Sequence, residues 1–460
     1  MPFTPHSDAP VGPVATELVP RLGLADTLRV ALGVVAPTLA QGVIARRPRV
    51  VALAERLDLD GRAVATVQGL HRRHGNGPVR LAIPGRRVAL VLGPDDVHAV
   101  LAGSPDPFAL ANREKRGALG QFQPHGVLAS HGAARARRRE VNERVLDTPH
   151  PVHRLAPSLV ATVREEARAV ARRAGSSGRL DWPTFSAGWR RTVRRVVLGD
   201  AAADDEALQG DLDALRSRAN WSYLLPRDRT RRDRLRRRLA AHLERAEDGS
   251  LAGLLAATAG GDAEVDPVDQ IPQWLFAFDP AGMAAIRALA LLAVDPAERA
   301  RVRADLTGAD LDAPQELRRL RAAVLESVRL WPTTPMILRE TTRDTEWGGA
   351  CLPAGTAVAV YAPFFHRDGD TLGVADRFAP GLWLGDGPVG DARTTWPLVP
   401  FSEGPGVCPG QNLVLLATST FLATLLEHHE HALAHPRRLD PAHLPGVISP
   451  FRVRFRTTAV

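Results

Sequence analysis

One long apolar segment restricts the folds open to this chain more than any other feature of its sequence. Residues 271–294 contain only two charged side chains, Asp279 and Arg287, and an arginine-rich helical pattern follows them. A segment of this length and apolarity is typical of a helix that is buried on all sides. Other helices must therefore surround it, and a chain of 460 residues with 45% apolar side chains can supply them.

The rest of the chain predicts a mainly α-helical protein with minor β-sheets. Helical spacing covers residues 28–70 and 94–260, and a last helix is predicted from Pro409 to about Glu430. A β-hairpin is predicted over residues 79–92, and short strands are predicted around residues 336–346 and 357–361. Strands and helices do not alternate, so a doubly wound α/β fold is not indicated. We expect one large domain over residues 1–460, with an N-terminal extension and the first helices in residues 1–60.

Composition excludes several classes of protein. Two cysteines cannot cross-link a secreted scaffold of this size, so we expect a reducing, cytoplasmic location. The net charge of +8 comes from scattered arginines, and only two tyrosines are available to stack on bases, which argues against nucleic acid. The chain begins without a basic signal region, and its apolar stretch at residues 30–45 is short for a membrane anchor.

A glycine-rich loop over residues 401–410 delivers Cys408 to the first turn of the last predicted helix. Gly404, Gly406 and Gly410 would let the backbone pass close beneath a flat ligand. The unpaired N–H groups and the positive dipole end of a helix N-terminus favour a thiolate. Taken alone, such a cysteine is more often a buried free thiol, so the neighbouring residues must show whether it is a ligand.

The loop resembles the haem-binding loop of the cytochrome P450 family, Phe-x-x-Gly-x-Arg-x-Cys-x-Gly, in which the cysteine is the axial ligand of the haem iron. Phe401, Gly404, Cys408 and Gly410 match this pattern. The resemblance implies the cytochrome P450 fold and haem b, with Cys408 as the iron ligand and the three matching residues beside the cofactor. Gly406 departs from the pattern, because the family usually has an arginine or histidine there that contacts a haem propionate. One propionate contact must come from elsewhere or be absent.

Glu326 and Arg329 lie three residues apart on a predicted helix, where such a pair is usually a solvated surface feature. Their position about 80 residues before Cys408 resembles the Glu-x-x-Arg helix of the family, a structural clamp behind the haem. The resemblance places Arg339 on a haem propionate. Leu382 stands where the family completes the clamp with an arginine, so another group must fix that corner, or it is looser.

His131 and Arg135 lie one helical turn apart and would share a helix face. They resemble the His-x-x-x-Arg helix of the family, whose two side chains bind the haem propionates; a solvated basic helix is the alternative. We expect residues 137–139, all arginine, to face solvent. The resemblance places them near the surface where an acidic electron donor docks, which implies ferredoxin and ferredoxin reductase as partners.

Asp279 and Pro280 fall on the acid and the usual threonine of the family pattern Ala-Gly-x-Asp-Thr. In the family, this hydroxyl and this acid help to deliver protons during dioxygen activation. Without the hydroxyl, water or a substrate group must relay protons, with Asp279 as the candidate relay, or the oxidant differs. Pro280 also removes the hydrogen bond to the Phe276 carbonyl and is expected to kink the helix. The alternative is a purely structural role, in which Pro280 kinks a core helix and Asp279 is hydrogen-bonded only to the backbone.

The residues leave three hypotheses for function. The resemblance, over roughly residues 60–458, implies a monooxygenase that hydroxylates or oxidatively couples an apolar or aromatic small molecule. Haem-thiolate peroxygenases also carry proline at this site, which makes a peroxide-driven enzyme the second hypothesis; their preceding arginine binds a fatty-acid carboxylate, whereas Asp279 would repel one. A non-catalytic haem sensor or carrier is the third, motivated by the departures at Gly406, Pro280 and Leu382, although no signalling domain or DNA reader is visible.

Lys115 is the only lysine of the chain, and this preference for arginine is typical of a GC-rich bacterial genome. We expect an enzyme of bacterial secondary metabolism, and we expect it to be a monomer. By position alone, five residues are expected to line the substrate pocket: Phe276, Phe278, Pro335, Met336 and Ile337.

Overall fold

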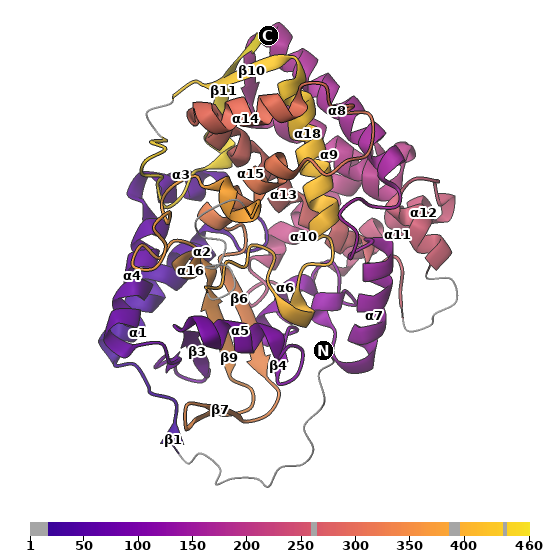
Figure 1. The fold of residues 1–460 in the computed structure, drawn as a ribbon. Coiled ribbons are helices and arrows are strands. Elements are labelled where there is room, and N and C mark those ends of the chain that lie inside the picture. The colour runs from indigo at the N-terminus through magenta and orange to yellow at the C-terminus, as the bar shows by residue number, and fades with distance from the viewer. Residues whose placement is uncertain (1–16, 259–264, 386–395, 436–438) are drawn as a thin grey trace, which may run out of the picture.

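The central apolar segment forms one helix, α13 (Ile271–Val294), as the sequence predicts. The computed structural model describes residues 17–258, 265–385, 396–435 and 439–460. In it, α13 packs against α9 (Trp182–Leu198), α15 (Arg318–Leu330) and α18 (Gln411–Glu427), which surround it in Figure 1. Within the described residues, α13 alone is long and apolar enough to cross a membrane, but 78% of its most apolar window is buried inside the protein. It is the core helix that its composition indicates.

The other described helices come from both the N-terminal and the C-terminal half of the chain. The N-terminal segment forms α1 (Leu24–Val30), a π-helical turn (Ala31–Val35), α2 (Ala36–Gln41), α3 (Pro48–Leu57) and α4 (Leu59–His74). They are followed by α5 (Pro94–Ala102), α6 (Arg113–Leu119), α7 (Gly132–Val145), α8 (Ala156–Ser177), α10 (Glu206–Ala219), α11 (Arg229–Arg245), α12 (Leu251–Thr258), α14 (Pro296–Leu306) and α16 (Ala362–His366). The last predicted helix ends at Glu427 instead of about Glu430, because residues 429–433 pair as a strand.

The largest sheet has the strand order β2-β3-β9-β6-β4 among the described residues. Its strands are β2 (Val79–Arg80), β3 (Val88–Val91), β4 (Phe108–Ala109), β6 (Met336–Thr341) and β9 (Ala357–Tyr361). The predicted hairpin is confirmed as β2 and β3, and the two later predicted strands are confirmed as β6 and β9, which pair antiparallel. A parallel pair, β3 with β9, joins the two halves of the sheet, so the N-terminal hairpin fixes the strand that carries Arg339.

Two smaller sheets lie at the periphery of the fold (Figure 1). One joins β1 (Glu17–Leu18), β8 (Ala350–Leu352) and β7 (Thr345–Trp347). The other joins β10 (His429–Leu433), β11 (Arg454–Ala459) and β5 (Arg179–Asp181). The fold is mainly α-helical with small β-sheets, as expected from the sequence.

Two hydrophobic cores meet beside the Cys408 loop. The larger surrounds α13 and includes α8, α9, α15 and α18, and Phe401 packs against it. The smaller lies between the five-stranded sheet, α4 and α5, and includes Leu101. The loop before Cys408 therefore runs along the boundary between the helical part and the sheet part of the molecule.

Replacing Gly282 of α13 with alanine is expected to destabilise the protein. A Cβ atom at Gly282 would lie 2.6 Å from Cδ1 of the buried Trp189 ring in α9, and overpacking of this kind costs about 1–3 kcal/mol. Gly210 in α10 is the matched control, because no heavy atom lies within 4 Å of a Cβ there, and alanine favours a helix by about 0.5–1 kcal/mol over glycine. Urea unfolding measures both variants. Equal stabilities would contradict the packing of α13 on α9.

Candidate active site around Cys408

The loop that carries Cys408 is closed by its own backbone. The Cys408 N–H donates to the Phe401 carbonyl at 2.9 Å, across the turn Gly404–Gly406. Gly404 has a φ of +64°, and a Cβ atom there would lie 2.5 Å from the Leu101 carbonyl of α5. Only glycine satisfies both conditions. Gly410 precedes α18 as its N-cap residue.

Burial raises the pKa of the Cys408 thiol, whereas the Gly410 N–H and the charge of Arg139 lower it. The expectation that the helix N-terminus lowers this pKa overall is therefore wrong for the protein alone, because desolvation outweighs the dipole. A coordinating metal ion would deprotonate the thiol outright. Arg139 itself donates to the Val407 carbonyl at 2.8 Å and ties α7 to the loop.

Three buried or half-buried cations converge beside this loop from three elements. Arg339 of β6 is 2% exposed and donates to the Ser104 hydroxyl at 2.8 Å and to the Ser402 hydroxyl at 3.3 Å. Arg135 of α7 is 7% exposed, and its Nε and Nη2 atoms are buried without a hydrogen-bond partner. Lys115 of α6, which the sequence analysis did not assign, donates from Nζ to the Leu338 carbonyl at 3.0 Å.

These cations perturb one another. Burial and the charge of Arg135 lower the pKa of Arg339 to about 10. Burial, followed by the charges of Arg339 and Arg135, lowers the pKa of Lys115 to about 7. Among the described residues, no carboxylate forms an ion pair with any of the three. Uncompensated buried charge is costly, so the cluster fits an anionic group such as the two carboxylates of a haem.

The glycine at position 406 is explained by the same cluster. A Cβ atom at Gly406 would lie 2.8 Å from Nη2 of Arg339. The guanidinium of Arg339 therefore occupies the space that a side chain at position 406 would need. This departure from the family pattern leaves the loop one cation short, and Arg339 lies in the space that the side chain would have filled.

The structure separates His131 from Arg135. His131 is an exposed N-cap residue of α7, and its Nε2 lies 2.6 Å from Nη1 of Arg116. Of residues 137–139, only Arg137 is exposed; Arg138 bonds the Ser130 hydroxyl, and Arg139 pairs with Glu143 as well as with the loop. The expectation that all three arginines face solvent is wrong, because the helix turns two of them toward neighbouring polar groups.

The predicted clamp is a buried network. Glu326 and Arg329 are both 0% exposed and pair at 2.6 Å. Arg329 donates to four main-chain carbonyls, those of His366, Val374, Ala375 and Arg377. Glu326 accepts from the Ala379 N–H at 2.8 Å and from Nε1 of Trp383 at 2.9 Å. The indole of Trp383 thus reaches the corner that lacks an arginine, while Leu382 is buried in the apolar core.

Asp279 forms an ion pair with Arg216 of α10. Arg216 is 4% exposed, its Cζ atom lies 5.0 Å from the centre of the Phe276 ring, and its Nε is buried without a hydrogen-bond partner. The charge of Asp279 is therefore compensated, which corrects the expectation that Asp279 would repel a carboxylate. Pro280 lies inside α13 and leaves the Phe276 carbonyl without the N–H that another residue would supply.

The predicted pocket residues do not all share one face. Phe276 is half-buried and meets the Phe122 ring edge-on at 5.9 Å between ring centres. Phe278 points elsewhere, with its ring 6.1 Å from that of Trp189 in the helical core. Its assignment to the pocket is wrong, because residues two apart on a helix point to nearly opposite sides. Pro335, Met336 and Ile337 are half-buried where β6 begins.

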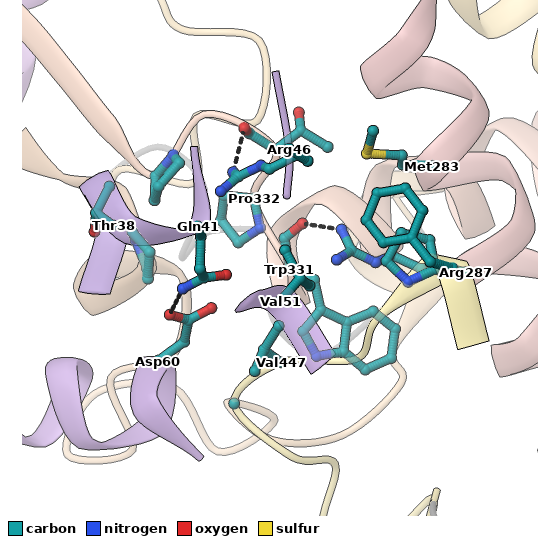
Figure 2. A pocket seen from close by; sticks show the side chains of 16 residues that line it. Thr38, Gln41, Arg46, Val51, Asp60, Met283, Arg287, Trp331, Pro332 and Val447 are labelled. Atoms are coloured by element: carbon teal, nitrogen blue, oxygen red, sulfur yellow. Dashed lines mark hydrogen bonds between the residues drawn. The ribbon is translucent and has the colours of Figure 1, made fainter. Parts of the chain in front are cut away.

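A small cavity of about 30 Å³, lined by both polar and apolar side chains, lies between the N-terminal helices and α13, as Figure 2 shows. Arg287, the second charge of α13, donates there to the carbonyls of Ile448 and Trp331, and burial lowers its pKa to about 9. Arg46 donates to the Thr333 carbonyl at 2.7 Å. Because residues 331–333 lead into β6, these two guanidinium groups fix the entry to the strand that carries Arg339.

A second group of possible metal ligands lies apart from Cys408. His125, Asp266 and Asp269 have ligand atoms within 4.8 Å of one another. Arg236 pairs with both carboxylates, at 2.5 and 2.6 Å. One guanidinium therefore already binds both carboxylates and compensates part of their charge, as in a structural ion-pair network.

Replacing Trp383 with phenylalanine is expected to cost about 1–3 kcal/mol of unfolding free energy, because a buried carboxylate loses a donor. Trp347→Phe is the matched control. Its Nε1 donates to the half-buried Thr345 hydroxyl, a neutral acceptor, so we expect a loss below about 1 kcal/mol. Chemical denaturation followed by circular dichroism gives both values. A Trp383 variant no less stable than the control would show that this indole does not complete the clamp.

Comparison with known proteins agrees with this geometry. A family model described as Cytochrome P450 matches residues 288–450, about a third of the chain. Cytochrome P450 734A5 from Oryza sativa subsp. japonica is 27% identical over 432 residues, which cover 82% of this chain and 78% of the rice protein. Cyclooctat-9-en-7-ol 5-monooxygenase from Streptomyces melanosporofaciens is 36% identical over 105 residues, 23% of this chain and 22% of the relative. Other plant and insect cytochromes P450 are matched over about a third of their length or less.

Among solved structures, the fold is similar to that of retinoic acid bound cyanobacterial CYP120A1. The TM-score is 0.69 at 17% identity, and the match covers 85% of this chain and 94% of that one. The likeness of structure establishes the fold, and the family match and named relatives establish the kind of protein. The chain has the cytochrome P450 fold, is similar in sequence to the cytochrome P450 family, and is an oxidoreductase of the monooxygenase type.

Proposed function

We propose that this protein is a haem-thiolate monooxygenase that binds haem b through Cys408 and oxidises an apolar or aromatic small molecule. One juxtaposition carries the proposal: a cysteine in a closed glycine loop lies beside Arg135 and Arg339, two buried cations without a carboxylate partner. A thiolate suits the metal at the centre of a porphyrin, and the cations suit its propionates. When bound, the haem supplies the oxygen chemistry, which a thiolate ligand favours by donating electron density.

The residues of this chain position the cofactor and its surroundings. Gly404 lets the loop approach α5, and the clamp of Glu326 and Arg329 fixes the segment behind the loop. Asp279 is the acid available for proton transfer in α13, and it is held in an ion pair with Arg216. Moving a proton through Asp279 therefore requires this pair to open, or water to reach its second oxygen.

Several observations support the substrate class and the electron donor. Phe276, Met336 and Ile337 are half-buried apolar side chains on α13 and β6. Two similar proteins carry carbon-rich small molecules in their names, cyclooctat-9-en-7-ol and retinoic acid. The Streptomyces relative and the arginine-rich composition support bacterial secondary metabolism. Net charge +8 and the exposed Arg137 suit an acidic ferredoxin, which a reductase would supply with electrons.

The Cys408→Ser variant tests the proposal directly. The reduced carbon monoxide complex of the wild-type protein is expected to show the red-shifted Soret band of a thiolate-ligated haem, and the variant is expected to lose it. Cys351→Ser is the control, because Cys351 lies in β8 and outside the loop, and it should keep the band. A wild-type protein that binds haem without this band, or binds none, would contradict the proposal.

A peroxide-driven peroxygenase is the second candidate, and two observations favour it. Pro280 provides no hydroxyl for proton delivery, and Arg216 compensates the charge of Asp279, so a carboxylate-bearing substrate is no longer excluded by that charge. The named relatives support an enzyme and not a non-catalytic haem carrier.

Pro280→Thr separates the two candidates. If the enzyme uses dioxygen and a reductase, the restored hydroxyl should raise the share of reducing equivalents that reach product by several-fold, with naphthalene as an aromatic probe. The measurement is hydrogen peroxide released per NADPH consumed. Pro280→Ala is the control, because it restores the N–H without a hydroxyl. Wild-type turnover with hydrogen peroxide alone, with no gain of coupling in the threonine variant, would instead establish the peroxygenase.

A further inference from the structure

We propose that Lys115 binds a haem propionate and supplies the positive charge that Gly406 leaves out of the Cys408 loop. The inference rests on the proposed haem-binding function and extends it to a helix, α6, that is remote from the loop in sequence. Its basis is the position of the Lys115 ammonium group between β6 and α7.

The start of α6 fixes the position of Lys115. The side chain of Asn112, the N-cap residue, accepts the Lys115 N–H at 2.9 Å. From this first turn, Nζ of Lys115 donates to the Leu338 carbonyl at 3.0 Å, and Nη1 of Arg339 donates to the same oxygen at 3.1 Å. Two cationic groups that share one acceptor lie side by side, and one carboxylate can bridge them.

The position of Arg339 explains why a second cation comes from α6. Nη2 of Arg339 lies 2.8 Å from where a Cβ atom of residue 406 would be, and it reaches the Ser402 hydroxyl. A long basic side chain at position 406 would displace it. The loop therefore cannot provide a cation of its own while Arg339 is in this place, and Lys115 is the cation that adjoins Arg339 from outside the loop.

The neighbouring carboxylates compensate Lys115 only weakly: the charge of Glu114 raises the pKa of Lys115, but by less than burial, Arg339 and Arg135 lower it. Glu114 and Glu340 both pair with Arg86, at 3.1 and 2.9 Å. The groups that face Lys115 from β6 and α7 are Arg339 and Arg135, and both are cationic. Together with burial, they lower the pKa of Lys115 to about 7. A carboxylate placed among the three cations would favour the protonated amine and restore its charge.

Lysine-specific labelling tests the contact, because Lys115 is the only lysine in the chain. Lys115 is half-buried, and formaldehyde with a borane reductant dimethylates accessible amines. Mass spectrometry of the peptide that contains Lys115, with the N-terminal amine as internal standard, follows the rate in haem-free and haem-loaded protein. We expect at least a 10-fold slower rate with haem and little protection by haem dimethyl ester, whose propionates carry no charge.

Two outcomes of the labelling would overturn the proposal. Equal rates with and without haem would show that Lys115 does not contact the cofactor. Equal protection by haem and by its dimethyl ester would show that the macrocycle covers Lys115 without a propionate contact. Laurate, a fatty acid, serves as a third probe. If laurate slows the labelling of Lys115 in haem-loaded protein and haem itself does not, the bound carboxylate belongs to a substrate, and the propionate contact is contradicted.

Variants measure the contribution of the charge. Transfer of haem to apomyoglobin is expected to be about 10-fold faster from Lys115→Met than from wild type, and Lys115→Arg is expected to restore slow transfer. Arg113→Met, an exposed cation on the same helix, is the control and should match wild type. Unchanged transfer from Lys115→Met, or equal transfer from the methionine and arginine variants, would refute the role. The carbon monoxide spectrum of each protein reports thiolate ligation separately, so failure of the proposed function is distinguishable from failure of Lys115.

Discussion

The buried ion pair between Glu326 and Arg329 is the interaction on which the geometry around Cys408 depends. Two charges with no exposed surface cost several kcal/mol unless their hydrogen-bonding capacity is met. Main-chain groups of residues 366–379 and the indole of Trp383 meet it. Because each of these bonds comes from a different point of the segment, the segment has one arrangement. α15 is fixed with it, and β6, the next strand of the chain, carries Arg339 to the loop.

The features that the sequence predicted are those encoded within a few residues. α13 follows from a run of apolar side chains, the Cys408 loop from the spacing of its glycines, and the buried pair from two residues one turn apart. The contacts that it missed join segments that are distant in sequence. Asp279 pairs with Arg216 of another helix, and Lys115 and Arg339 donate to the same carbonyl, that of Leu338. No local pattern signals such contacts, because they are determined by packing.

One misassignment and one open question had a signal in the sequence. The helical period of about 100° per residue already places Phe276 and Phe278 on different sides of α13, which the structure bears out. The missing clamp arginine at Leu382 is followed directly by a tryptophan, whose N–H is a donor of suitable reach. The chain also buries arginines such as Arg164, Arg194 and Arg287 against carbonyls and carboxylates. These three arginines therefore have a structural role inside the fold.

The pair between Arg216 and Asp279 links α10, on one side, with the acid of the central helix on the other. A ligand that lifts α10 from α13 must break this pair, because Arg216 contacts the acid and the Phe276 ring at once. Entry of such a ligand and separation of Asp279 from Arg216 would then occur in one step. Without such a ligand, Asp279 would stay paired with Arg216, and a proton could reach it only through water at its other oxygen.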